Sequence, residues 1–215
     1  MVQNVSEKSV LPILWYFADP MCSWCWGFSP VMTQIKADYD KQLKIALVMG
    51  GLQPGTTEAI TEASRAEILH HWHQVQQTTG QNFDFENALP AGFIYNTEPA
   101  CRAVITVAQL DKTKTFEYFT TIQAAFYSKN NDVTQTACLQ QLAQESGLDG
   151  DDFSELFATE EMQLNTQRNF QFSRKVGVQG FPTLILNQGE TLHVLSRGFQ
   201  DFETLSNNLD QLLAG

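Results

Sequence analysis

Leu-Pro-Ile-Leu-Trp-Tyr-Phe-Ala-Asp-Pro-Met-Cys-Ser-Trp-Cys-Trp-Gly-Phe, residues 11–28, joins a short apolar run to two closely spaced cysteines. The run over 11–17 predicts a strand that is buried on both faces, and Pro20 ends it in a turn. A helical pattern follows at once, so Cys22 is expected at the start of a helix and Cys25 one turn further on. Unpaired N–H groups and partial positive charge at a helix N-terminus favour a thiolate. Cys22 would therefore be nucleophilic, with Cys25 as its resolving thiol.

The spacing of the two thiols admits three interpretations. A strand, a short loop and a C-x-x-C motif that opens a helix are typical of a redox pair. A structural zinc site would need two more ligands, usually from a second close pair, and Cys101 and Cys138 are isolated in the sequence. An inert buried pair is the third interpretation. The arrangement favours the redox pair, and we expect no metal site.

Length and charge limit the classes of protein and partner. The chain has 215 residues, which suits one large domain or two small ones. Its formal net charge of −11 argues against nucleic acid or an anionic membrane surface as a partner. No run is long enough to span a bilayer, and residues 1–14 lack the apolar core and cleavage site of a signal peptide. We therefore expect a cytoplasmic protein, in a compartment that keeps most thiols reduced.

The hydrophobic pattern divides the chain into three parts. The first holds the strand at 11–17, a helix over 24–39 that Pro30 is expected to bend, and a buried strand over 43–49 that ends at Gly50-Gly51. The second part is helical except for a loop over 80–96, with helices predicted at 57–79, 97–110, 116–128, 134–146, 151–157 and 160–176. The third holds strands at 183–186 and 192–196 around a turn at 187–190, and a last helix capped by Asp201.

The order of elements is therefore β-α-β, a helical block, and then β-β-α. This is the order of an α/β thioredoxin fold with a large all-helical insertion between its two halves. We expect a thioredoxin-like domain made of residues 1–56 plus 176–215, and an inserted helical domain made of residues 57–175.

Four segments spread over nearly the whole chain carry a family resemblance. They are Asp19-Pro20-Met21-Cys22-Ser23-Trp24-Cys25-Trp26-Gly27-Phe28, Gly50-Gly51-Leu52, Glu98-Pro99-Ala100-Cys101-Arg102-Ala103 and Gly177-Val178-Gln179-Gly180-Phe181-Pro182-Thr183. With them the chain resembles the DsbA-type disulfide oxidoreductases, and within these the FrnE-like group of predicted cytosolic protein-disulfide isomerases. It departs from familiar members at Ser23-Trp24 and at the bulky Phe181, two places that tune thiolate stability.

The resemblance implies a protein dithiol–disulfide oxidoreductase or isomerase. It makes Cys22 and Cys25 the catalytic residues, and Ser23, Trp24, Phe181 and Pro182 the substrate-binding residues. By itself Pro182 is typical of a trans proline that opens a strand. The resemblance instead implies a cis bond that offers strand-like pairing to a substrate segment.

Partners and cofactors follow from the same resemblance. Protein or peptide thiols and disulfides would be the substrates, with glutathione as an optional co-substrate or a thioredoxin-type protein as reductant. The cysteine pair itself carries the two electrons, so no further cofactor is expected.

Two other functions stay open. Kappa-class glutathione transferases and hydroxychromene-carboxylate isomerases share the inserted-helix outline, but they place a serine where Cys22 stands and activate glutathione. The two cysteines favour disulfide exchange over that chemistry. The other alternative is a binding role, as a thiol-dependent holdase or metal-stress protein that uses the helical block as a cradle.

Three residues near or beyond the motif each have two interpretations. Asp19 is either a proton relay that tunes the thiols or a turn-forming residue before Pro20. Cys101 and Cys138 are expected to pack as small hydrophobic residues in the core, with a disulfide between them as the alternative.

Histidines and aromatic residues give weaker signals. His70 and His73 share a helix face, for which a solvated surface is favoured over a metal site. Trp24 is expected to be exposed, where it would form an apolar rim for substrates together with Trp26. Phe28 is expected in the core.

Overall fold

The computed structural model describes residues 11–214, and the part of the expected thioredoxin-like domain over 1–10 lies outside them. The strands are β1 (Ile13–Ala18), β2 (Lys44–Met49), β3 (Thr183–Gln188) and β4 (Thr191–Arg197). The helices are α1 (Ser23–Asp38), α2 (Glu62–Thr79), α3 (Glu98–Leu110), the 3-10 helix η1 (Lys112–Lys114), α4 (Thr115–Lys129), α5 (Thr136–Glu145), α6 (Gly150–Phe157), α7 (Glu160–Lys175) and α8 (Phe202–Leu213).

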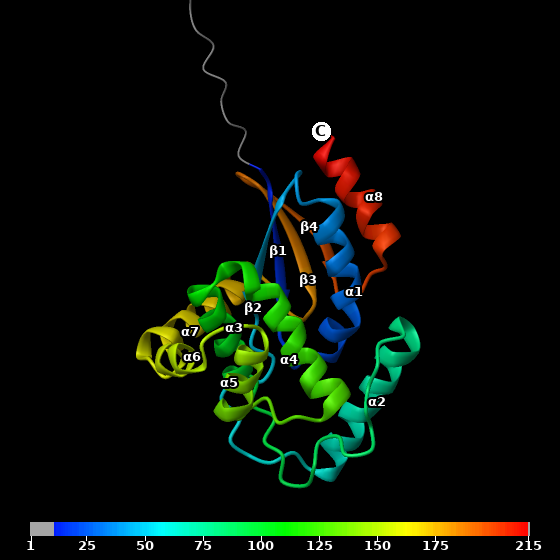
Figure 1. Ribbon diagram of the computed structural model, residues 1–215. Helices are drawn as coiled ribbons and strands as arrows, with labels where there is room; N and C mark the ends of the chain where they lie inside the picture. The colour runs from blue at the N-terminus through cyan, green and yellow to red at the C-terminus, as the bar shows by residue number, and fades with distance from the viewer. Residues whose placement is uncertain (1–10, 215) are drawn as a thin grey trace, which may run out of the picture.

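The strands form one mixed sheet in the order β2-β1-β3-β4. β1 pairs in parallel with β2 and antiparallel with β3, and β3 pairs antiparallel with β4. Figure 1 shows α1 and α8 beside the sheet and helices α2 to α7 gathered at one end of it. The expected α/β thioredoxin fold with a helical insertion between its halves is confirmed.

The hydrophobic core is continuous between the sheet and the insertion. A single buried cluster runs from Leu14 of β1 through Phe28 of α1 to Trp72 of α2 and Tyr118 of α4. The inserted helices thus bury the same core as the sheet. The division into two domains at residues 57 and 175 stays a prediction.

β1 is buried on both faces, as its apolar run predicts. Alternate side chains of a strand point to opposite faces, so Leu14 and Tyr16 join the cluster that contains α1. Trp15 and Phe17 point the other way, where Phe172 of α7 packs against both rings with centroids 5.1 and 5.9 Å away. This central strand carries the segment that leads to Cys22.

The start of α2 differs from the sequence-based prediction. The helix begins at Glu62, where the hydroxyl of Thr61 accepts a hydrogen bond from the backbone N–H of Ser64 at 3.1 Å. The expected start at Thr57 was wrong. The backbone N–H of Ile60 is instead held by the carbonyl oxygen of Phe93 at 2.9 Å, so residues just before the helix are tied to the loop over 80–96.

Two smaller corrections concern a helix start and a turn. The helix predicted over 97–110 begins at Glu98. The hydroxyl of Thr97, just before it, accepts the N–H of Gln53 at 3.1 Å, while the Asn96 side chain accepts the N–H of Glu98. The turn between β3 and β4 is shorter than the expected 187–190, because Asn187 and Gln188 still pair within the sheet.

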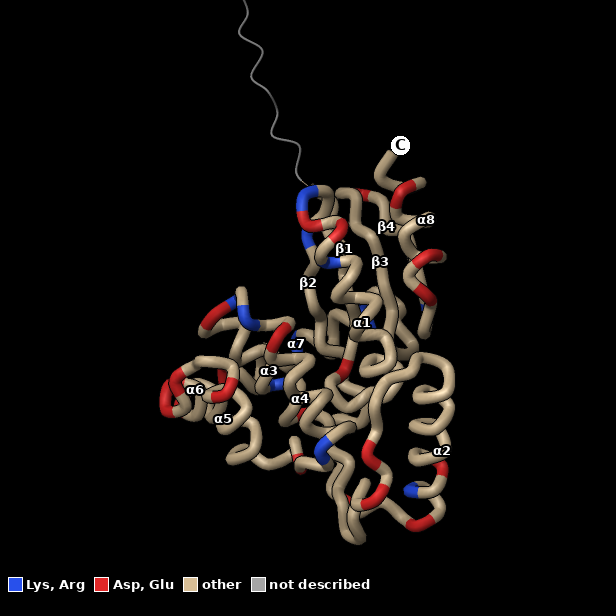
Figure 2. The backbone as a smooth tube through the Cα atoms, turned by 45° about the vertical axis from the view of Figure 1, so that its right-hand side comes forward, with Lys and Arg blue, Asp and Glu red and all other residues tan. Residues whose placement is uncertain are grey.

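Charge and hydropathy of the described residues add two facts. Between residues 11 and 214, no helix has the length together with the apolar character that crossing a membrane requires. In Figure 2, acidic positions are spread over several elements and gather at α6, whereas Lys and Arg are fewer.

Candidate redox site

Cys22 occupies the N-cap position of α1, with extended backbone angles of φ −93° and ψ 115°. Its thiol makes no capping hydrogen bond to the helix and instead donates to the carbonyl oxygen of Phe181 at 3.5 Å. Cys22 is 5% exposed, whereas Cys25, nearly one helical turn further on, is 0% exposed. Cys22 is therefore the member of the pair that a substrate sulfur would reach.

The segment opposite Cys22 is the one that precedes β3. The Phe181–Pro182 peptide bond is cis. The carbonyl oxygen of Pro182 accepts the N–H of Gly198 at 2.8 Å, which anchors the segment to the end of β4. The Phe181 ring lies against Gly50, where any Cβ would overlap it. Residues from both halves of the sheet thus hold the Phe181 carbonyl over the Cys22 thiol.

The buried position of Cys25 sets its protonation. Burial raises the pKa of the Cys25 thiol well above its ordinary value, and the adjacent Cys22 and the carboxylate of Asp19 raise it further. The backbone of Asp19 opposes this with a hydrogen bond that lowers the pKa. Cys25 is therefore held as a neutral thiol.

Asp19 joins three segments behind the cysteine pair. Its fully buried carboxylate accepts hydrogen bonds from the N–H of Met21 at 2.8 Å, the N–H of Leu52 at 2.7 Å and the thiol of Cys101 at 3.3 Å. Burial raises the pKa of Asp19, and the hydrogen bonds from Leu52 and Met21 work against that rise. Asp19 forms the expected local turn, and it also fastens that turn to the end of β2 and to α3.

The other two cysteines lie in different surroundings. Cys101 is fully buried in α3, as expected, and burial raises the pKa of its thiol. Cys138 is only half-buried in α5. Both are free thiols, as are Cys22 and Cys25.

The aromatic residues of the motif are less exposed than the sequence suggested. Trp24 is half-buried, with its ring centroid 6.1 Å from that of Phe199, so the expectation of an exposed side chain was wrong. Trp26 is also half-buried, and its indole N–H donates to the carbonyl oxygen of Asn82 at 3.0 Å. Phe28 is fully buried, as predicted.

Three buried tyrosines surround the pair, and sequence reasoning missed all of them. The Tyr95 hydroxyl donates to the carbonyl oxygen of Met21. Tyr16 and Tyr127 are buried, and within the described part of the chain their hydroxyl groups have no hydrogen-bond partner of normal geometry. Burial raises the pKa of each, so all three stay neutral. Tyr95 and Tyr127 come from the insertion, and no local pattern signals their approach to Cys22.

The histidine cluster lies apart from this site. His70 and His71 are exposed beside Gln74, and His73 stacks on Phe85 with ring centroids 3.9 Å apart. Over residues 11–214, no three His, Cys, Asp or Glu side chains gather in a way that could hold a metal ion.

Comparison with known proteins identifies the family. The model of the DSBA-like thioredoxin domain matches residues 13–210. The chain belongs to this family. A crystal structure of a candidate protein disulfide isomerase from Nitrosomonas europaea is similar to it, with 43% identity, a TM-score of 0.91, and coverage of 95% of this chain and 98% of that one.

Two further relatives are named as a disulfide reductase and as a ClpXP adapter protein. The cytosolic disulfide reductase DsbM from Pseudomonas aeruginosa is 25% identical with a TM-score of 0.78, over 94% of this chain and all (100%) of that one. The ClpXP adapter protein SpxH from Halalkalibacterium halodurans is 21% identical over 83% of this chain, which spans about 60% of the length of that relative. Family and solved relatives place the chain among the DsbA-type disulfide oxidoreductases.

Proposed function

We propose that this protein exchanges disulfides with protein or peptide substrates in the cytoplasm, using Cys22 as nucleophile and Cys25 as resolving thiol. The observation that carries the proposal is the position of Cys22 at the N-cap of α1, with its thiol 3.5 Å from the carbonyl oxygen of Phe181. The N–H groups and dipole at the start of α1 present partial positive charge to a sulfur in that position. The cytosolic DsbM relative supports the location.

The reaction balances with the two cysteines alone. The Cys22 thiolate attacks one sulfur of a substrate disulfide, forms a mixed disulfide and releases the other substrate sulfur as a thiolate. Cys25 loses its proton and attacks the Cys22 sulfur, which forms the Cys22–Cys25 disulfide and releases the second substrate thiolate. Two electrons have passed to the substrate. A thiol reductant then restores the dithiol, and every step can run in reverse.

Backbone groups next to Pro182 are suited to hold a substrate segment. The Pro182 carbonyl is already engaged by Gly198, whereas the Cys22 thiol is the only donor to the Phe181 carbonyl among residues 11–214. That proton is gone once Cys22 forms a mixed disulfide, so the Phe181 carbonyl becomes free to accept an N–H from an extended substrate. Ser23 and Trp24, both half-buried at the start of α1, would flank the bound sulfur.

Glutathione is the proposed reductant or co-substrate, with a thioredoxin-type dithiol protein as the other source of electrons. The DsbM protein from Pseudomonas aeruginosa has been solved with glutathione, at 26% identity to this chain and a TM-score of 0.76. The same relative keeps glutathione activation of the transferase type as an alternative. That chemistry uses a serine where this chain has Cys22, so conversion of Cys22 to Ser distinguishes the two.

An insulin reduction assay with dithiothreitol or glutathione tests the proposal. Cys22→Ser is expected to abolish insulin reduction, and Cys25→Ser is expected to accumulate a covalent mixed disulfide with a peptide substrate. Cys138→Ser, which removes a half-buried thiol in α5, is the matched control and should retain full activity. Insulin reduction that survives Cys22→Ser would refute the assignment, and glutathione conjugation by that variant would favour the transferase alternative.

A binding role is the second candidate, because SpxH proteins from Halalkalibacterium halodurans and Bacillus subtilis are named as ClpXP adapters. As an adapter or holdase the chain would hold a client protein without exchanging disulfides. In that case Cys22→Ser should leave suppression of client aggregation intact. Loss of both aggregation suppression and insulin reduction in that variant would exclude a thiol-independent binding role.

A further inference from the structure

The strand β2 has an open edge. It lies at the end of the sheet and pairs with β1 in parallel. The N–H of Lys44 donates to the carbonyl oxygen of Pro12 at 2.8 Å, so Lys44 turns its backbone groups toward β1. Alternate residues of a parallel strand bond to the same neighbour, so Ile45 and Leu47 turn theirs the other way. Within residues 11–214, no other segment bonds to the N–H or carbonyl groups of these two residues.

The two ends of this edge are closed or charged. The N–H of Met49, the next residue with the same orientation as Leu47, donates to the side-chain oxygen of Asn169 at 3.3 Å. Lys44 is exposed at the opposite end of the strand. Proteins cover or charge sheet edges in this way because an unpaired edge accepts another strand. Between these ends the described chain leaves a short stretch open, which suits one extended segment of a few residues.

A groove runs along the open stretch. Its volume is about 630 Å³, within the roughly 300–1,000 Å³ of typical ligand-binding clefts. Ile45 and Leu47 line it on the side of β2, and residues from the end of α3 to the start of α4 line the other side, among them Ala108, Thr113 and Phe116. This second wall leaves room beside β2 for a single segment, but not for the sheet of a second copy of the chain.

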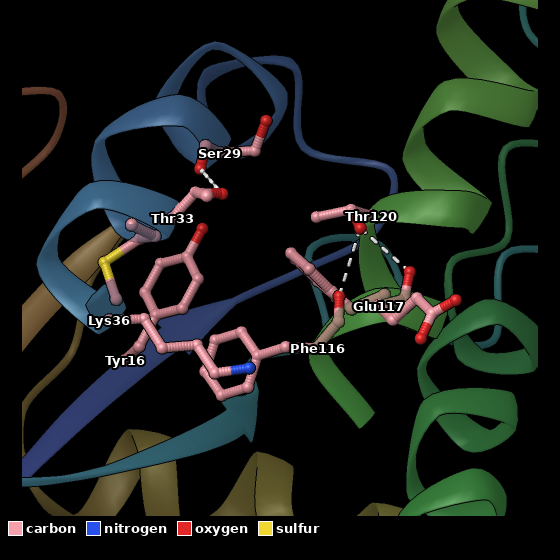
Figure 3. Close-up of a pocket in the computed structure, with 9 residues that line it drawn as sticks. Tyr16, Ser29, Thr33, Lys36, Phe116, Glu117 and Thr120 are labelled. Atoms are coloured by element: carbon pink, nitrogen blue, oxygen red, sulfur yellow. Dashed lines mark hydrogen bonds between the residues drawn. The ribbon is translucent and has the colours of Figure 1, made fainter. Parts of the chain in front are cut away.

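The groove is basic although the protein is acidic. Its charged lining residues are Lys36, Lys44, Lys112 and Asp40, whereas the whole chain has a formal net charge of −11. The three lysines are exposed and form no ion pair with any residue that the structure describes. The Lys36 ammonium lies 5.0 Å from the centre of the Phe116 ring, and Figure 3 shows this side chain alongside the ring. Unpaired cations beside apolar side chains suit a segment in which acidic and apolar residues alternate.

We propose that an extended acidic segment of a partner polypeptide binds in this groove as an additional strand of the sheet. Its backbone pairs with the free N–H and carbonyl groups of Ile45 and Leu47. Its carboxylates face the three lysines, and its apolar side chains lie against Phe116. The inference stands apart from the proposed disulfide exchange, because Lys36 lies about 20 Å along α1 from Cys22.

A fluorescein-labelled peptide of sequence Glu-Val-Glu-Ile-Glu-Val-Glu with blocked ends serves as the probe in fluorescence polarisation. The full chain should bind it about tenfold more tightly than Lys-Val-Lys-Ile-Lys-Val-Lys, although the net charge of −11 opposes this preference. An acidic probe with methylated inner backbone nitrogens keeps the charges and side chains but cannot pair as a strand. It should bind about tenfold more weakly than the unmethylated probe, because it loses its backbone hydrogen bonds.

Charge reversal locates the binding surface. Lys44→Glu combined with Lys112→Glu should weaken binding of the acidic probe about tenfold, because each reversal replaces an attraction between exposed charges by a repulsion. Lys129→Glu combined with Lys175→Glu changes the net charge equally at exposed positions outside the groove, and should leave the affinity within about twofold. Cys22→Ser should bind the probe as the wild type does.

Amide hydrogen exchange measured by NMR identifies the edge that the probe pairs with. In the free protein, Ile45 and Leu47 should exchange quickly and Ala46 slowly, because the N–H of Ala46 faces β1. Saturation with the acidic probe should slow the exchange of Ile45 and Leu47 about tenfold, whereas the exchange of Ala46 should change little.

Each contrary result overturns a stated part of the proposal. Equal binding of the methylated probe overturns strand addition, and equal weakening by the two pairs of lysine variants overturns the groove as the location. Slow exchange of Ile45 and Leu47 in the free protein means that the edge is already covered, which overturns the open site. Concentration-dependent dimers that the probe dissociates assign the groove to a second copy instead. Loss of probe binding in Cys22→Ser places the probe at the redox site, whereas failure of insulin reduction refutes only the proposed function.

Discussion

Alanine substitutions at the glycines that follow β2 test how the sheet supports the candidate site. A Cβ at Gly50 would overlap the ring of Phe181. A Cβ at Gly51 would lie 2.8 Å from Cδ1 of Phe170, and Gly51 also has a φ of +73°. Gly55 has a similar φ of +77°, but apart from its chain neighbours no described residue has an atom within 4 Å of its Cβ position. Alanine at Gly50 therefore introduces a clash alone, alanine at Gly51 a clash with backbone strain, and alanine at Gly55 backbone strain alone.

The expected free energies follow from these differences. A left-handed conformation costs a residue with a Cβ about 1–2 kcal/mol, overpacking costs about 1–3 kcal/mol, and alanine recovers about 0.4–1 kcal/mol from the unfolded chain. Phe181 is half-buried and can turn toward solvent, whereas Phe170 is 4% exposed and has no room to move. The loss of unfolding free energy should be about 1 kcal/mol for Gly50→Ala and for Gly55→Ala, and about 3 kcal/mol for Gly51→Ala.

Urea unfolding monitored by tryptophan fluorescence measures these values, and insulin reduction measures their effect on the site. Gly50→Ala should lower the activity, because turning the Phe181 ring displaces the carbonyl that faces Cys22. Gly55→Ala should leave the activity unchanged at a similar loss of stability. The pair thus separates damage to the site from general destabilisation.

A double-mutant cycle gives the sharpest test. Because the Gly50→Ala clash is with one ring, Gly50→Ala combined with Phe181→Ala should be more stable than the sum of the single effects predicts. Additive effects would show that the ring does not lie against Gly50. Equal stability losses at Gly51 and Gly55 would refute the contact with Phe170.

Other substitutions probe separate parts of the structure. Burial raises the pKa of Asp19 above 3.8, so the folded state binds the carboxyl proton more tightly than the unfolded state does. Protonation of Asp19 therefore stabilises the fold below pH 3.8, and this stabilisation is lost as the pH rises through the pKa of Asp19 in the folded state. Asp19→Asn should remove this part of the pH dependence in urea titrations, and parallel curves for the two proteins would contradict it. Thr61→Ala should lower the free energy of unfolding by about 1 kcal/mol through loss of the α2 cap, whereas Thr57→Ala should leave it unchanged. A larger loss for Thr57→Ala than for Thr61→Ala would instead support a helix that begins at Thr57. Gly27→Ala places a Cβ 2.7 Å from Cγ1 of Val75. Calorimetry should therefore show a loss of about 1–3 kcal/mol in unfolding free energy, part of which Val75→Ala should restore. An unchanged free energy of unfolding would contradict the close packing of α1 against α2.

Local patterns were enough to predict most of the architecture. Apolar runs located each described strand. Helical periodicity located α1 and α3 to α8 within a few residues, but not the start of α2 or the short helix η1. The spacing of Cys22 and Cys25 placed them at the start of α1. These features depend on residues within a turn or two of one another. The start of α2 was missed because the residues before it bond to Phe93, which lies far along the chain.

The sequence by itself therefore determined the order of elements and the position of the two thiols on the first turn of a helix, since both follow from short-range steric and hydrophobic periodicity. Only the tertiary structure decided what surrounds those thiols. The Phe181 carbonyl reaches Cys22 across 159 positions, and the Cys101 thiol reaches Asp19 across 82. Tyr16 meets Cys25 because β1 and α1 pack face to face in one core. Such pairings depend on how the chain folds back on itself, and many partners are compatible with the same local pattern.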